Sequence, residues 1–272
     1  MGYIEQKESN TVMIATNPPN HSVSLHAPVS STMVNRNVPD QRLDAHLRTW
    51  LGSWRPRQSI EVVVWPGRDL PGWDGASILG VGIESPLGTV LSLSPRLVTE
   101  PSLFDPQRVE FALSSPDAVT TVPTLLGQPD LVLTRAVFRW STTPASLPEV
   151  GDWVDPEDGR LPAWLRPFNG GVLVAWDEYG RYAAGVGVKQ HNRHAHELAV
   201  HTEQAHRGRG LATTLIAQAA RRILASGALP LYLHEAHNIG SAKVAEAAGF
   251  SDDGWRVLGL YPAQSNATSS SA

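Results

Sequence analysis

The sequence contains no cysteine. This absence excludes disulfide bonds, thiolate nucleophiles and metal sites with thiolate ligands. No apolar run approaches the length of a membrane span, and the first residues show neither a basic start nor an apolar signal core. We therefore expect a cytoplasmic protein without a membrane partner.

An excess of positive charge is also missing. The 272 residues include 22 Lys and Arg against 26 Asp and Glu, which gives a formal net charge of −4 and a pI near 6.2. Non-specific nucleic-acid binding requires a basic face, so nucleic acid is not an expected partner. The apolar share of 42% is ordinary for a globular protein and allows a sizeable core.

The first part of the chain shows two kinds of pattern. Residues 1–40 have no sustained period and are predicted to be a disordered tail. Residues 41–130 are interpreted as an accessory N-terminal lobe. Its expected elements are a helix from Leu43 to Trp54 with a structural His46 on its flank, strands at 61–65 and 89–93, and a short helix within 117–127.

Residues 131–262 are predicted to form the main domain, followed by a polar, disordered tail at 263–272. The expected sheet is mixed and mainly antiparallel. Its elements are a strand at 131–140, a Pro-rich connection with a short helix at 163–166, a hairpin over 172–189, a strand at 194–202, a helix at 210–226, a strand at 229–234, a helical run from Asn238 to Ala248 and a last strand at 255–260.

The segment Val200 to Ala212 carries the strongest chemical signal. Its sequence, Val-His-Thr-Glu-Gln-Ala-His-Arg-Gly-Arg-Gly-Leu-Ala, predicts a strand, a tight loop and the start of a helix. Gly208 and Gly210 allow a sharp turn and close approach of an anion, and the free N–H groups of the helix would face that anion. Arg207 and Arg209 add positive charge, so we interpret the loop as a diphosphate site.

Two standard phosphate loops do not fit. A P-loop needs Lys and Ser or Thr after its last glycine, where Leu211 and Ala212 stand, and the dinucleotide fingerprint needs a third glycine where Thr213 stands. The pattern of Arg or Gln, two residues, Gly, one residue, and Gly or Ala is met by Arg207, Gly210 and Ala212. This pattern resembles the pyrophosphate loop of the GNAT superfamily of acyl-CoA-dependent N-acyltransferases.

A second stretch supports the resemblance. Asn238-Ile-Gly-Ser241 opens a helical run that ends at Ala248-Gly249-Phe250, similar to a second motif of the superfamily. The resemblance implies an α/β (α+β) fold with splayed central strands flanked by helices, and acetyl-CoA or another acyl-CoA as co-substrate. It assigns cofactor contacts to Val200, Thr202, Arg207, Gly208, Arg209, Gly210, Leu211, Ala212, Asn238 and Ser241. Asn238 has a second interpretation as a helix N-cap.

The implied reaction is acyl transfer from acyl-CoA to a primary amine of a small molecule or peptide by direct attack. An alkylammonium must first lose a proton, and Glu197 or His194 is the expected base. Relatives often carry a Tyr acid seven residues after the Asn, but Ala245 stands there, which leaves water, Tyr232 or His234 as the donor. The fold is compatible with a homodimer.

Two alternatives belong to other functional classes. The departure at Ala245 would also suit an acyl-CoA-binding sensor without turnover. Seven histidines between His191 and His237, with His194 and His196 on one face of a strand, prompt a metal-binding hypothesis. No carboxylate follows a known ligand spacing, so we expect no metal site.

Overall fold

The computed structural model describes residues 40–98 and 104–263, which lie within one compact unit, Asp40–Ala272. The tails predicted at 1–40 and 263–272 fall outside the described residues, except for Asp40 and Ala263. Among the residues that are described, every helix is too short or too polar to cross a membrane.

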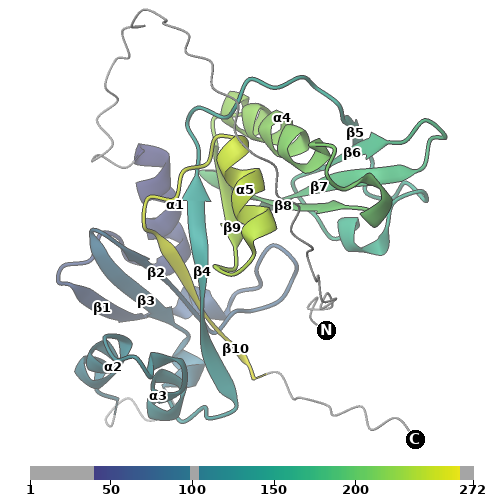
Figure 1. The fold of residues 1–272 in the computed structure, drawn as a ribbon. Coiled ribbons are helices and arrows are strands. Elements are labelled where there is room, and N and C mark those ends of the chain that lie inside the picture. Colours follow the sequence, from purple (N-terminus) through teal and green to yellow (C-terminus); the bar gives the residue numbers. More distant parts are fainter. Residues whose placement is uncertain (1–39, 99–103, 264–272) are drawn as a thin grey trace, which may run out of the picture. The chain divides into compact units, whose positions relative to one another are not determined.

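A ten-stranded sheet organises the described part of the chain, with the strand order β1-β3-β2-β10-β4-β9-β8-β7-β6-β5 (Figure 1). The elements, in chain order, are α1 (Gln41–Leu51), β1 (Ile60–Val64), η1 (Pro66–Asp69), β2 (Gly80–Ser85), β3 (Gly88–Leu93), η2 (Pro95–Leu97), α2 (Pro106–Leu113), α3 (Ala118–Leu125), β4 (Leu131–Trp140), β5 (Asp152–Val154), η3 (Ala163–Leu165), β6 (Val172–Trp176), β7 (Tyr182–Gln190), β8 (Ala195–Thr202), η4 (Gln204–His206), α4 (Leu211–Ala225), β9 (Leu229–His234), α5 (Ile239–Ala247) and β10 (Arg256–Pro262).

The predicted fold class is confirmed. Strand pairs are antiparallel except for β1 with β3 and β8 with β9. The β8–β9 ladder runs only from Ala195–Leu229 to Leu198–Tyr232, although β8 continues to Thr202. The two central strands therefore splay apart beyond Leu198, and one edge of β8 is left without a strand partner there.

The sheet continues across residue 130, where the accessory lobe was predicted to end. β2 pairs with β10, and β10 pairs in turn with β4. The sequence patterns missed β2, α2 and β5. β2 was obscured by two glycines, of which Gly82 lies so close to β3 that a Cβ there would be 2.5 Å from the Val90 carbonyl oxygen.

The predicted first helix is present as α1 and ends earlier than expected. Asp40 caps its N-terminus by accepting a hydrogen bond from the Arg42 N–H, and Gly52 ends it in the left-handed conformation, with φ of 78°. Leu43, Leu47 and Leu51 point into a core that also contains residues of β2, β4 and β9. The 41–51 segment is therefore packed against the central strands.

The two faces of the β6–β8 region carry different layers. Helices α4 and α5 cover one face, where Leu215 and Ile216 pack with Leu198 and Tyr232 (Figure 1). On the other face the residues around η3 pack against β6 and β7. Gly187 makes this possible, because a Cβ there would lie 2.3 Å from the Phe168 ring. The 141–171 connection contains β5 and η3 but no α-helix.

Candidate functional site

The loop between β8 and α4 has the backbone shape expected of an anion site. Gly208 and Gly210 both adopt a left-handed conformation with φ of 76°, which favours glycine. No side chain caps the N-terminus of α4, and a Cβ at either glycine would meet open space. The first N–H groups of α4 therefore remain available at an exposed, positively polarised helix end.

Two arginines lie in the same loop. Arg207 is exposed and its Nε donates to the Thr202 carbonyl oxygen at 3.2 Å, which ties the loop to the end of β8. Arg209 is also exposed. Within residues 40–98 and 104–263, neither arginine forms an ion pair. Their charges are therefore available to an anionic ligand beside the helix end.

The free edge of β8 begins where its pairing with β9 stops. The Glu203 N–H donates to the Ala183 carbonyl oxygen on β7, and hydrogen-bonding direction alternates along a strand. The main-chain groups of Val200 and Thr202 therefore point toward β9, on the side where the strands diverge. This is the edge on which an extended ligand could add as a partial strand.

Asn238 acts as a helix N-cap. Its Oδ1 accepts a hydrogen bond from the Ser241 N–H at 2.9 Å, as the second interpretation of this residue anticipated. The Ser241 hydroxyl lies 2.7 Å from the Tyr232 hydroxyl, and Ala245 is buried one turn further along α5. Burial raises the pKa of Tyr232, so this phenol keeps its proton at neutral pH. Cofactor contact by Asn238 and Ser241 stays a prediction.

An open pocket of about 590 Å³ lies beside the start of the loop between β8 and α4. Its walls come from the turn of the β6–β7 hairpin and from η4. The lining residues are Asp177, Arg181, Tyr182, Glu203, Gln204, Ala205 and His206. Asp177 is already engaged, since it accepts hydrogen bonds from the Tyr179 and Arg181 N–H groups at 2.9 Å.

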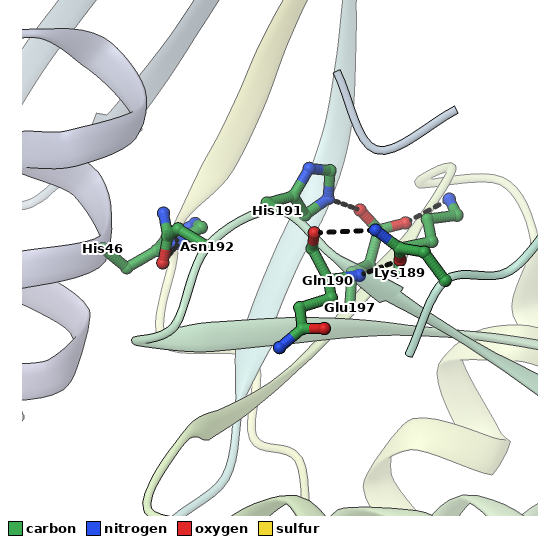
Figure 2. Close-up of polar contacts among 7 residues, drawn as sticks. His46, Lys189, Gln190, His191, Asn192 and Glu197 are labelled. Carbon is green, nitrogen blue, oxygen red and sulfur yellow. Dashed lines mark hydrogen bonds and ion pairs between the residues drawn. The ribbon is translucent and has the colours of Figure 1, made fainter. Parts of the chain in front are cut away.

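Glu197 lies buried on β8, on the face opposite α4, within a group of polar side chains (Figure 2). Its Oε1 forms an ion pair with Lys189 Nζ, and its Oε2 accepts a hydrogen bond from His191 Nε2 at 3.0 Å. Burial alone would raise the pKa of Glu197, but the Lys189 charge and the His191 hydrogen bond outweigh burial and lower it to about 2. The carboxylate is thus ionised and occupied at both oxygens.

His194 lies in the turn before β8, apart from Glu197. Its N–H donates to Asn192 Oδ1 at 3.0 Å, and its carbonyl oxygen accepts from the Leu229 N–H at 2.8 Å. Arg193 Nε donates to its ring Nε2 at 3.4 Å. The roles of Glu197 and His194 as bases stay predictions, and the structure brings only Glu197 into a cluster of polar side chains.

Two members of that cluster were missed by the sequence analysis. Lys189 was placed only as the end of a strand, and His191 only as one of several histidines. A signal was present, because two antiparallel strands joined by a short turn place Lys189 opposite Glu197, as the β7–β8 register shows. Among the described residues, no three His, Cys, Asp or Glu side chains are grouped so that they could hold a metal ion.

Comparison with known proteins points to one family. Residues 135–250 match the family model described as the acetyltransferase (GNAT) family. The match begins in β4 and ends just after α5, so it includes the splayed strands, the loop between β8 and α4, and the Glu197 cluster. No match was found among curated proteins.

Three solved structures are similar to part of the chain. A GNAT-family acetyltransferase from Colwellia psychrerythraea is 17% identical, with a TM-score of 0.39, over 49% of this chain and 57% of its own. A GCN5-related N-acetyltransferase-like protein from Streptococcus suis is 20% identical, with a TM-score of 0.37, over 48% and 63%. A GCN5-related N-acetyltransferase from Kribbella flavida is 13% identical, with a TM-score of 0.39, over 53% and 64%. The chain thus spans less than two thirds of each.

Proposed function

We propose that this protein transfers an acetyl or related acyl group from acyl-CoA to a primary amine by direct attack, as the match of residues 135–250 to the GNAT acetyltransferase family suggests. The observation that carries the proposal is the uncapped N-terminus of α4 behind two left-handed glycines, placed at the end of a strand with a free edge. This combination suits a long ligand with a diphosphate at one end and amides along its arm.

Two regions of the described residues would contact different parts of acyl-CoA. The amides of residues 208–212 and the charges of Arg207 and Arg209 would hold the diphosphate. The main-chain groups of Val200 and Thr202 would pair with the amides of the arm. This arrangement would bring the thioester toward the point where β8 and β9 diverge, near Leu198 and Tyr232.

The proton transfers that the reaction needs are set by the ionised state of the amine acceptor. An alkylammonium has no free lone pair, so a group near the thioester must remove a proton before attack. Glu197 and His194 are the predicted bases. For the leaving thiolate, Tyr232 is the proposed donor in place of the residue missing at Ala245, since its hydroxyl is protonated and joined to Ser241 on α5.

The proposal is tested by thiol release from acetyl-CoA. The chain has no cysteine, so every thiol detected comes from CoA itself. We expect purified protein to release CoA when primary amines such as tyramine, putrescine and glycinamide are added, with the N-acetyl product visible by mass spectrometry. Tight acetyl-CoA binding in calorimetry without release for any of these amines would contradict transfer and indicate a sensor.

Asn238→Asp separates helix capping from cofactor contact. The aspartate keeps an oxygen that can accept from the Ser241 N–H, so the stability of the protein should change little, whereas Asn238→Ala should cost about 1 kcal/mol of unfolding free energy. If the Asn238 amide also contacts acyl-CoA, Asn238→Asp should weaken CoA affinity in calorimetry. Unchanged affinity would leave Asn238 as a cap alone.

A further inference from the structure

His191 forms an imidazole–carboxylate pair with the buried Glu197, which directly precedes Leu198, the last β8 residue paired with β9. His191 lies in the turn between β7 and β8, and its Nε2–H donates to Glu197 Oε2 at 3.0 Å. The carboxylate is held from its other side by Lys189. Because the ionised carboxylate can only accept, the ring nitrogen of His191 that carries the proton of this hydrogen bond is Nε2.

The second ring nitrogen of His191, Nδ1, can accept a proton from a ligand. Within the part of the chain that the structure describes, Nδ1 has no hydrogen-bond partner, and in Figure 2 it points away from Glu197. The ring is held by aromatic neighbours on α1, with centroids 5.5 Å from Trp50 and 6.3 Å from His46. The His191 side chain keeps 11% of its surface exposed, so the cluster does not seal it off.

His46 reinforces this arrangement from α1. Burial lowers the pKa of His46 to about 3, and its neutral ring lies 3.0 Å from the Asn192 side-chain amide nitrogen. It therefore places no positive charge next to His191. Asn192 Oδ1 also accepts a hydrogen bond from the His194 N–H. Both polar atoms of the Asn192 side chain, Nδ2 and Oδ1, therefore hold the turn that carries His191 in place.

We propose that His191 accepts the proton of the acceptor amine through Nδ1 and that Glu197 acts through His191 as a positioning residue. This inference rests on the proposed transferase function. It differs from a direct role of the carboxylate, because both Glu197 oxygens are occupied by Lys189 and His191. An orienting carboxylate behind an imidazole fixes the tautomer and stabilises the imidazolium that forms.

The step balances as follows. The ammonium of the acceptor gives one proton to His191 Nδ1, and the freed lone pair forms the C–N bond at the thioester carbonyl carbon. The C–S bond breaks with its electron pair on sulfur, Tyr232 donates the proton that makes this sulfur the thiol of free CoA, and the proton lost from nitrogen as the amide forms restores the Tyr232 hydroxyl. The imidazolium then returns its proton to water.

The charge balance around His191 suits this cycle. The titratable and charged groups that face it are Lys189 from β7, Glu197 and His196 from β8, and His46 from α1. Burial and the neighbouring His191 lower the pKa of His196, so it stays neutral near pH 7. Lys189 and Glu197 cancel, and protonation of His191 adds a single positive charge beside a carboxylate.

The test compares two nucleophiles in His191→Gln, whose amide can still donate to Glu197. Transfer to tyramine, a protonated alkylamine, should fall by about 100-fold or more. Transfer to hydroxylamine, which is largely unprotonated at pH 7, should stay close to wild type. The ionisation that governs kcat/KM for tyramine should also disappear from the pH profile.

His237→Gln is the matched control. His237 Nε2 lies 2.9 Å from Glu235, a pair of the same kind, but its side chain is 84% exposed, so both nucleophiles should react as with wild type. Equal loss with both nucleophiles in His191→Gln would show a structural role and overturn the proposal, as would unchanged transfer. If wild-type protein binds acetyl-CoA but acetylates neither nucleophile, the proposed transferase function is wrong, and the proposed role of His191 is wrong too.

Discussion

Replacing Gly210 by Trp is expected to abolish detectable binding of CoA while the protein stays folded. Gly210 has φ of 76° and opens α4, and the space around its missing Cβ is empty of protein atoms. An indole there would occupy the approach to the first helical N–H groups without striking the core. We expect CoA affinity to fall by about 100-fold or more, equivalent to about 3 kcal/mol, in isothermal titration calorimetry.

The opposite end of the same helix supplies the control. Gly227 follows α4 with φ of 86° and open space around its missing Cβ, so Gly227→Trp imposes a similar backbone strain away from the loop. Both variants should lose a similar amount of thermal stability, and only Gly210→Trp should lose CoA. Wild-type affinity in Gly210→Trp would show that the loop between β8 and α4 does not belong to the proposed CoA site.

Lys189→Met should be among the most destabilising single changes in the described sheet. The variant keeps the apolar stem of Lys189 but leaves the buried Glu197 carboxylate without its cation. Removing one partner of a buried ion pair typically costs about 3–5 kcal/mol. Urea unfolding at pH 7 measures this loss, and a loss below 1 kcal/mol would show that the cluster is solvated in solution.

The unfolding free energy lost in Lys189→Met should also depend on pH. The pKa of Glu197 is lowered from an ordinary 4.5 to about 2, so its ionised form stabilises the fold above pH 4.5 and this contribution fades as pH falls toward 2. The difference between wild type and Lys189→Met should therefore narrow in acid. Arg96→Met, which removes a pair with Asp69 whose arginine is 62% exposed, should cost less than about 1 kcal/mol.

The parts of the fold that sequence predicted are those with local causes. The run from Val200 to Ala212 holds its own strand signal, its glycines and its helix start within thirteen residues, and it appears as β8, the loop and α4. α1 has an Asp cap, an apolar stripe and a glycine stop in the same short span. In each case the residues that start, stop and orient the element lie within the same short segment, so the sequence pattern is enough to predict it.

The parts that were missed depend on residues distant in sequence. β5 has three residues and exists through its pairing with β6, and β2 tolerates glycines because β3 and β10 lie against them. The contact between His46 and Asn192 joins positions 146 apart. The pairing of Lys189 with Glu197 could have been predicted by counting residues across the β7–β8 hairpin. The packing of His191 against α1 could not, because α1 is distant in sequence.

The position of β10 bears on the order in which the molecule can assemble. β10 follows every other described strand in the sequence, yet it lies between β2 and β4, which are made much earlier. Until residues 256–262 emerge, β2 and β4 each present an unpaired edge, a form that invites association with other chains. Synthesis of β10 therefore closes the sheet, and until then nascent chains should depend on protection of those two edges.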